Sequence, residues 1–281
     1  MLCRLANRVC STAVVRRALS VPAAEHQTDP RAYGRRQRRG RAAFLDEFGT
    51  DGSVNGDRVL DLGCGMGANT FAVVRAGASE VIGVDLDVEK VRCAAAAAGE
   101  AGEGRARFAA QSGAALAFDA GRFDVVLLLD VIEHLPDPAA VLAECARVLR
   151  TGGRLLVTFP PYRSPWGAHL FTHVPVPWAQ LLFRDAEILD LWRELHSSAV
   201  ARGEVSCSAH RERAIIDATS TAALWDCNGM TIERFLDQVE KAPLALGRVR
   251  TKVLGNLGGL VAAIPMLREY LVTRVSAVLE A

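Results

Sequence analysis

The sequence predicts an α/β protein whose central β-sheet is doubly wound and largely parallel. Short apolar runs such as 58–62 and 123–129 lack the in-and-out alternation of half-exposed strands, which is typical of parallel strands buried on both faces. Between residues 58 and 159 these runs alternate with stretches of helical period, as strand–helix–strand units require. Half of the 281 residues are hydrophobic and 23% are charged, which is the balance of a globular domain.

The first half of the expected sheet is punctuated by glycine and by turn-forming residues. A loop at 49–57 is rich in Gly, Asp, Ser and Asn, and a glycine run at 63–67 follows the first strand directly. The elements expected here are a helix at 41–48, strands at 58–62, 81–84 and 107–110, and helices at 68–76 and 88–98. Such sheets bind ligands at the carboxyl ends of their strands, so the residues just after each strand are the site candidates.

The second half continues the alternation and is then interrupted. The elements expected here are a strand at 123–129, a helix at 138–149 ended by Gly152 and Gly153, a strand at 154–159, helices at 187–200 and 231–239, the latter capped by Thr231, and strands at 248–254 and 273–279. The stretch 162–230 breaks the regular pattern. We expect it to be a helical, substrate-covering lid inserted after the fifth strand.

An arginine-rich arm precedes this pattern. Residues 1–41 contain ten Arg but only Glu25 and Asp29 as acids, and we expect a disordered or helical arm before one domain at 42–281. The composition resembles a mitochondrial transit peptide, so a mitochondrial location through residues 1–25 is the alternative to the cytoplasmic one that we expect. Residues 42–281 carry 23 basic and 30 acidic side chains, so we expect no nucleic-acid partner.

The cysteines and the apolar stretches exclude other classes. Seven cysteines form no Cys-x-x-Cys pair, and no His spacing completes a zinc pattern, so we expect no metal site and a reducing compartment. The longest apolar stretch, 257–267, is shorter than the ~20 residues that cross a bilayer, so we expect no membrane span.

The glycine run predicts the kind of cofactor. Its spacing is Gly63-x-Gly65-x-Gly67, which differs from the dinucleotide pattern Gly-x-Gly-x-x-Gly. Asp61 precedes it and would repel a pyrophosphate, whereas it would attract a cationic group. Asp85 ends the second strand, where an acid accepts ribose hydroxyls. S-adenosylmethionine, which has an ammonium, a sulfonium and a ribose, fits this pattern; a nucleotide site and a purely structural turn remain the alternatives.

Four ordered segments resemble the motifs of the class I S-adenosylmethionine-dependent methyltransferases. They are Val59–Gly67 (VLDLGCGMG), Val81–Asp87 (VIGVDLD), Phe123–Pro138 (FDVVLLLDVIEHLPDP) and Leu149–Val157 (LRTGGRLLV). The small-molecule type 11 branch is the one that they resemble. This resemblance implies a Rossmann-like sheet of seven strands, S-adenosyl-L-methionine as cofactor, and methyl transfer to an oxygen, nitrogen or carbon of a small molecule by in-line displacement.

The resemblance also implies roles for residues at the cofactor. The candidates are Asp61 for the ammonium, Gly63, Cys64, Gly65 and Gly67 along the methionine part, Asp85 for the ribose, Leu86 near the adenine, Ser112 and Gly113 after the third strand, and Asp130 after the fourth. Cys64 would contribute its backbone N–H. Ser112 stands where the family often has an acid that contacts the adenine amine, and a serine accepts that hydrogen bond without charge assistance.

Side chains on the acceptor side are the candidates for catalysis. His134 and His169 are candidate general bases, because an imidazole titrates near neutral pH. Tyr162 and Trp166 are candidate walls for an apolar acceptor. Each has a structural alternative: a hydrogen bond that caps the next turn for His134, and packing within the lid for His169, Tyr162 and Trp166.

The sequence is also compatible with two further functions. The first is a catalytically weak or inactive protein that binds the cofactor as a scaffold, which Ser112 favours. The second is a nucleic-acid methyltransferase that uses the basic arm. The acidic balance of residues 42–281 argues against the second.

Overall fold

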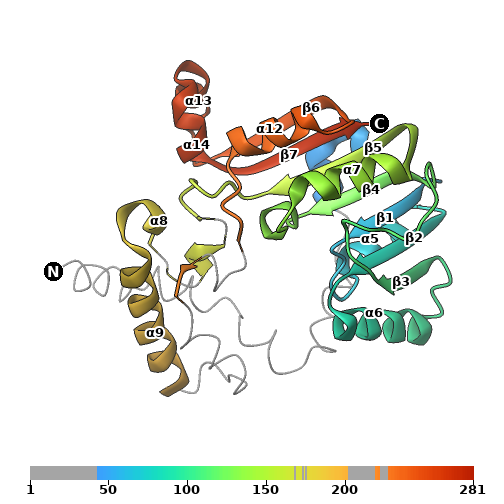
Figure 1. The fold of residues 1–281 in the computed structure, drawn as a ribbon, viewed down its shortest axis with the longest axis horizontal. Helices are drawn as coiled ribbons and strands as arrows, with labels where there is room; N and C mark the ends of the chain where they lie inside the picture. Colours follow the sequence, from blue (N-terminus) through green and yellow to red (C-terminus); the bar gives the residue numbers. More distant parts are fainter. Residues whose placement is uncertain (1–42, 168, 173, 175, 202–218, 222–226) are drawn as a thin grey trace. The chain divides into compact units, whose positions relative to one another are not determined.

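The structure is a computed structural model, and it describes residues 43–167, 169–172, 174, 176–201, 219–221 and 227–281 (Figure 1). The basic arm at 1–41 lies outside the described residues, so its expected conformation and targeting role stay predictions. The described residues fall into two compact units. The sheet unit comprises residues up to 159 together with 232–251 and 274–281, and the insert unit comprises residues 160–231 and 252–273.

A seven-stranded sheet in the order β3-β2-β1-β4-β5-β7-β6 confirms the doubly wound α/β class. Its strands are β1 (Arg58–Leu62), β2 (Glu80–Asp85), β3 (Ala106–Ala110), β4 (Phe123–Leu129), β5 (Leu149–Phe159), β6 (Ala245–Val253) and β7 (Val272–Glu280). Strands β1 to β5 pair in parallel, and β7 pairs antiparallel with β5. The order reverses between β1 and β4, which is where such sheets bind their ligands.

Helices pack on both faces of this sheet. The sheet unit has α5 (Ala68–Arg75), α6 (Val88–Ala101), α7 (Pro138–Val148) and α12 (Ile232–Lys241), with short 3-10 segments η1 (Ala43–Gly52) and η2 (Ile132–His134). Leu156 of β5 shares an apolar core with residues of η1, α5 and α6. Phe159 instead contacts Phe235 of α12, with ring centroids 5.0 Å apart. Since successive strand residues face opposite sides, α12 covers the face opposite to η1.

Local capping explains where two of the helices begin. The Asp87 carboxylate accepts hydrogen bonds from the N–H groups of Glu89 and Lys90, so α6 starts directly after the β2 turn. Asp137 does the same for α7 through Ala140, with Pro138 in the first helical turn. Both helices therefore begin at defined points along the edge formed by the carboxyl ends of the parallel strands, which we call the ligand edge.

Some expected boundaries were wrong. The helix expected at 41–48 is the 3-10 segment η1, which continues to Gly52 with a break at Gly49. Strand β5 begins at Leu149 rather than 154, because α7 leads directly into it and the Gly152–Gly153 pair lies inside the strand. Its register against β4 shifts between Phe123 and Val125, so the early residues of β5 form an irregular extension.

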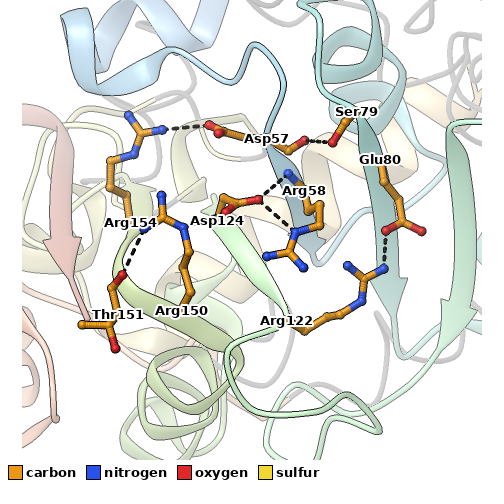
Figure 2. Close-up of polar contacts among 9 residues, drawn as sticks. All are labelled: Asp57, Arg58, Ser79, Glu80, Arg122, Asp124, Arg150, Thr151 and Arg154. Carbon is orange, nitrogen blue, oxygen red and sulfur yellow. Dashed lines mark hydrogen bonds and ion pairs between the residues drawn. The ribbon is translucent and has the colours of Figure 1, made fainter.

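An ion-pair network fastens the amino ends of the parallel strands (Figure 2). The Asp124 carboxylate accepts from Arg58 Nε at 3.1 Å and from Arg150 Nε at 2.7 Å. Partial burial opposes its charge, but hydrogen bonds from Arg58 and Arg150 lower the pKa of Asp124 to about 2. Arg122 also pairs with Glu80 there. These ends lie opposite the ligand edge, so the network has a structural role.

The insert unit has an apolar centre of its own. Its elements are η3 (Leu170–Thr172), α8 (Ala179–Leu182), α9 (Asp185–Ala201), α13 (Gly258–Ala263), η4 (Pro265–Leu267) and α14 (Arg268–Leu271). Its buried apolar cluster contains Leu170, Val174, Ala179, Ile188, Leu191 and Trp192. Trp178 Nε1 donates to the Tyr270 carbonyl oxygen at 3.0 Å, which joins the two segments of this unit. The helix expected at 187–200 is confirmed as α9, whereas the covering role of 162–230 stays a prediction.

The short helices between β6 and β7 were not predicted from the sequence. Glycine and proline interrupt the apolar stretch 257–267, which folds into two short pieces, α13 and η4, rather than one helix, and α14 follows directly after it. None of the helices in the described residues has the length and apolar character that crossing a membrane requires.

Candidate functional site

The glycine loop between β1 and α5 packs closely on its neighbours. The N–H groups of Gly63 and Cys64 both donate to the Val84 carbonyl oxygen, at 2.7 and 3.0 Å, which ties the loop to β2. Gly63 has φ 78°, and a Cβ added there would lie 2.3 Å from Val131 Cγ2. Gly65 has φ 53°, but a Cβ there would meet no atom of the described residues within 4 Å. A side chain at position 63 would thus clash with Val131, whereas the space beside Gly65 is open among the described residues.

Asp61 lies directly beneath this loop. It is 1% exposed, and Thr70 Oγ1 of α5 donates to its carboxylate at 2.6 Å. Burial raises the pKa of Asp61 to about 6 despite the Thr70 hydrogen bond. No basic side chain in the described part of the chain pairs with it. A cationic ligand group placed beside such a carboxylate would stabilise its charged form.

Asp85 fastens the loop from the end of β2. One of its carboxylate oxygens accepts from the Gly65 N–H at 2.8 Å, and the other accepts from the Asp87 N–H at 2.9 Å. A carboxylate has about four acceptor positions, so hydroxyl donors can bind alongside these two. Asp85 therefore shapes the loop as well as ending the strand at the position expected for a ribose contact.

The side chains near Asp85 differ sharply in exposure. Cys64 is buried, and burial raises the pKa of its thiol, so its side chain is unsuited to act as a nucleophile. Leu86, the residue after Asp85, is 70% exposed. A large apolar side chain at the ligand edge offers a surface on which a flat ring can pack.

Ser112 and Gly113 lie just beyond β3. The Gln111 N–H donates to the Asp85 carbonyl oxygen at 3.1 Å, which brings this turn to the end of β2. Ser112 Oγ accepts weakly from the Ala114 N–H at 3.3 Å, and Gly113 packs against Leu62. Ser112 thus lies beyond the end of β3, close to the end of β2 that carries Asp85.

The turn after β4 brings Asp130 and His134 to the same edge. Asp130 has the unusual φ of 55°, and its carboxylate pairs with Arg274 of β7. His134 ends η2, where its Nε2 lies 3.9 Å from the Oε1 of the fully buried Glu133. The sheet unit thus groups two of the predicted residues with the glycine loop, through the contact between Val131 and Gly63.

The remaining candidates belong to the insert unit. Burial raises the pKa of Tyr162, whose backbone N–H donates to the Met230 carbonyl oxygen at 2.8 Å. Trp166 packs edge-on against Phe171, with ring centroids 4.7 Å apart. His169 has φ 75°. These contacts fit a structural role for the two aromatic residues, and the acceptor-side roles of all three stay predictions.

Sequence reasoning missed three residues of this site. Thr70 stands nine positions after Asp61, where the first turn of α5 brings it over the carboxylate, so strand–loop–helix spacing alone was a usable signal. Val131 packs on Gly63, and Arg274 pairs with Asp130 from 144 positions further along the chain. No local pattern indicates either of these contacts.

Part of this chain is similar in sequence to known methyltransferases. Residues 60–157 match the methyltransferase domain of the type 11 family. Ubiquinone biosynthesis O-methyltransferases are 36% identical over 105 residues in Leptothrix cholodnii and 41% identical over 101 residues in Paracidovorax citrulli. These alignments cover 37% and 36% of this chain and 44% and 42% of the relatives. The chain thus spans about half the length of the curated relatives that it matches.

Solved structures share the fold over most of the chain. A methyltransferase from Mesorhizobium loti that depends on S-adenosylmethionine has a TM-score of 0.53 at 16% identity, covering 87% of this chain and 100% of that one. A geranyl diphosphate C-methyltransferase from Streptomyces coelicolor A3(2) has a TM-score of 0.55 at 16% identity, covering 85% and 74%. Residues 60–157 are thus similar to the methyltransferase domain of the type 11 family, and the seven-stranded sheet is the fold that these solved structures share.

Proposed function

We propose that this chain binds S-adenosylmethionine and catalyses methyl transfer to a hydroxyl group of a small molecule. The observation that carries the proposal is the buried Asp61 carboxylate beneath a glycine loop whose outer side is open at Gly65. An acid that is buried beside Thr70, without a basic partner in the described residues, fits the ammonium of the cofactor. The O-methyltransferase activity in the names of its relatives supports oxygen as the acceptor atom.

The residues at the ligand edge fit the other parts of this cofactor. Asp85 has acceptor positions left for ribose hydroxyls after binding the N–H groups of Gly65 and Asp87. Leu86 offers an exposed apolar surface for the adenine, and Ser112 offers a hydroxyl for its polar edge. Bound S-adenosylmethionine would supply an electrophilic methyl group on a positively charged sulfur.

The chain's own contribution to catalysis is alignment and proton removal. Glycine-loop contacts would fix the cofactor so that the acceptor oxygen approaches in line with the breaking bond. His134 would accept the hydroxyl proton, and the buried Glu133 beside it would stabilise the resulting imidazolium. Asp61 would act on the ammonium rather than near the sulfur. An anion held at the sulfur would stabilise the charged reactant more than the transition state.

Calorimetric titration with S-adenosylmethionine and S-adenosylhomocysteine tests the cofactor site. We expect saturable binding by the wild type and its loss in Asp85→Ala, which removes a clamp on the loop. Arg248→Met is the matched control, because Arg248 pairs with Asp51 in the same unit but does not contact the loop. A folded wild-type protein that binds neither compound would contradict the proposal.

An acceptor screen tests the reaction. Hydroxylated aromatic and quinone-like compounds would be offered with isotopically labelled cofactor, and methylated products would be identified by mass spectrometry. His134→Gln should lower kcat far more than it weakens cofactor binding if His134 is the base. Transfer that occurs only to nitrogen or carbon acceptors would refute the choice of oxygen. The expectation of no metal stays a prediction, which the same assay tests by chelation.

A second candidate function is a scaffold that binds the cofactor without turnover. Ser112 favours it, because its hydroxyl replaces the acid that this family often has near the adenine. Tight binding with no product across the acceptor panel would support the scaffold. Ser112→Asp should then strengthen cofactor binding without creating turnover.

A further inference from the structure

An ion-pair network holds the turn after β4, and the proposed chemistry does not use it. Arg274 Nη1 lies 3.0 and 3.1 Å from the two carboxylate oxygens of Asp130. Arg274 Nη2 donates to Thr158 Oγ1 at 3.0 Å, and Thr158 Oγ1 donates to Asp130 at 3.2 Å. The three side chains form a closed ring of hydrogen bonds that joins β7, β5 and the end of β4.

The backbone of this turn needs such support. Asp130 has φ 55°, in the left-handed region that residues other than glycine rarely occupy. Its N–H donates to the Thr158 carbonyl oxygen at 2.9 Å. Contacts with both its backbone and its carboxylate therefore hold Asp130 in a conformation that its own preferences oppose.

The next residue passes this restraint to the glycine loop. Val131 lies against Gly63, as the 2.3 Å approach of a Cβ added at Gly63 shows. Side chain and backbone are in contact here, and packed contacts of this kind transmit displacement from one neighbour to the other. A shift of the turn at Asp130 would therefore move or loosen the loop above Asp61.

Arg274 is itself fixed from a third direction. Its Nε donates to Glu47 Oε2 at 2.9 Å, and Ser276 Oγ donates to the same oxygen at 2.8 Å. Burial opposes the positive charge, but Asp130 and Glu47 outweigh it and raise the pKa of Arg274. A planar guanidinium satisfies three acceptors in different directions at once, which a lysine ammonium on its flexible stem does not reproduce.

We propose that Arg274 is a positioning residue for the cofactor: it holds Asp130 so that Val131 keeps the glycine loop in its binding conformation. The inference rests on the proposed function, because it assigns the loop to S-adenosylmethionine. Arg274 would act only through the β4 turn and would not contact the cofactor.

The test compares Arg274→Met and Arg274→Lys with Arg248→Met. Arg248 is a matched control, because its Nη1 pairs with Asp51 of η1 at 2.9 Å and so also joins a late strand to that segment. Each variant would be measured for thermal unfolding and for its Kd for S-adenosylhomocysteine. We expect Arg274→Met to weaken binding on the order of tenfold, Arg274→Lys to restore part of the loss, and Arg248→Met to leave binding unchanged.

Asp130→Asn provides a second variant if Arg274→Met does not fold. Asparagine tolerates the left-handed backbone, so this change removes the charge and spares the turn. We expect Asp130→Asn to weaken binding of S-adenosylhomocysteine too. The double variant Asp130→Asn with Arg274→Met should bind it no more weakly than whichever single variant has the higher Kd. In active preparations the KM for S-adenosylmethionine should rise more than kcat falls.

Two results would overturn this inference. One is an Arg274→Met variant that binds within about twofold of the wild type, which is the scatter expected of unlinked sites. The other is an additive loss in the double variant, which would show that Arg274 does not act through Asp130. Failure of the wild type to bind S-adenosylhomocysteine is a separate outcome and would refute the proposed function.

Discussion

The burial of Asp61 predicts that replacing it stabilises the protein while abolishing cofactor binding. In Asp61→Asn the amide oxygen can still accept the Thr70 hydrogen bond, which is 2.6 Å long in the wild type. The variant cannot ionise, so it avoids placing a charge where only 1% of the residue is exposed. It also loses the negative charge that is proposed to hold the ammonium.

The magnitude follows from the two pKa values of Asp61. The value rises from 3.8 to about 6, so the folded state holds the proton more tightly than the unfolded chain does. The stability that this group contributes is therefore fully present below pH 3.8 and is lost as the pH rises through 6. The loss is about 1.6 kcal/mol at pH 5 and about 3 kcal/mol at pH 7.

Urea unfolding of the cofactor-free protein at pH 5, 6 and 7 measures this effect. Relative to Asp61→Asn, the wild type should lose about 1.4 kcal/mol of unfolding free energy between pH 5 and pH 7. This slope is independent of any fixed cost of burying the amide. The exposed Asp119→Asn serves as the control and should show no such trend. A difference that is constant with pH, or tight binding of S-adenosylhomocysteine by Asp61→Asn, would refute the reasoning.

Three further predictions use other parts of the sheet unit. Gly65→Ala should abolish cofactor binding but lower the unfolding free energy by only about 1 to 2 kcal/mol, because the positive φ of Gly65 strains an alanine while the described residues leave room for its Cβ. Gly56→Ala is the control: Gly56 also has a positive φ and room for a Cβ, so this variant should still bind the cofactor in the same calorimetric assay. Asp124→Asn should lower the unfolding free energy at pH 7 by at most about 2 kcal/mol and leave cofactor binding intact. The lowered pKa of Asp124 gives stability that is present above pH 3.8 and is lost as the pH falls through 2. The difference in unfolding free energy between wild type and Asp124→Asn should therefore shrink in acid, and a difference that is constant with pH would contradict the prediction. Cys145, with its pKa raised to about 12 by burial, should resist alkylation of the native protein at pH 8 while Cys93 reacts, as peptide mass spectrometry would show; equal labelling would contradict this.

The parallel core of the fold was predictable because its signals are local. Strand β4 is an unbroken apolar run, and its seven residues match the expected bounds of 123–129. The element whose type was predicted wrongly, η1, also has a local physical cause. The η1 segment has amphipathic spacing, but its hydrogen bonding is 3-10, which the spacing of apolar residues does not distinguish over ten residues.

The site was predictable only where its residues lie next to strand ends. Asp61 and Asp85 lie at the end of β1 and β2, so the topology rule alone places them at the ligand edge. Arg274 has no comparable signal, because it meets Asp130 only through the antiparallel insertion of β7. Long-range polar contacts of this kind depend on sheet order, which composition and periodicity do not contain.

The position of β7 also has a consequence for how the chain folds. β7 lies between β5 and β6 but is synthesised after both, so β5 presents an open edge until β7 arrives. An open, apolar strand edge pairs readily with other chains, and such long-range pairing is slow. During synthesis this edge is therefore the main aggregation hazard of the sheet. A chain cut before residue 272 should accumulate as insoluble protein rather than as a folded, soluble one.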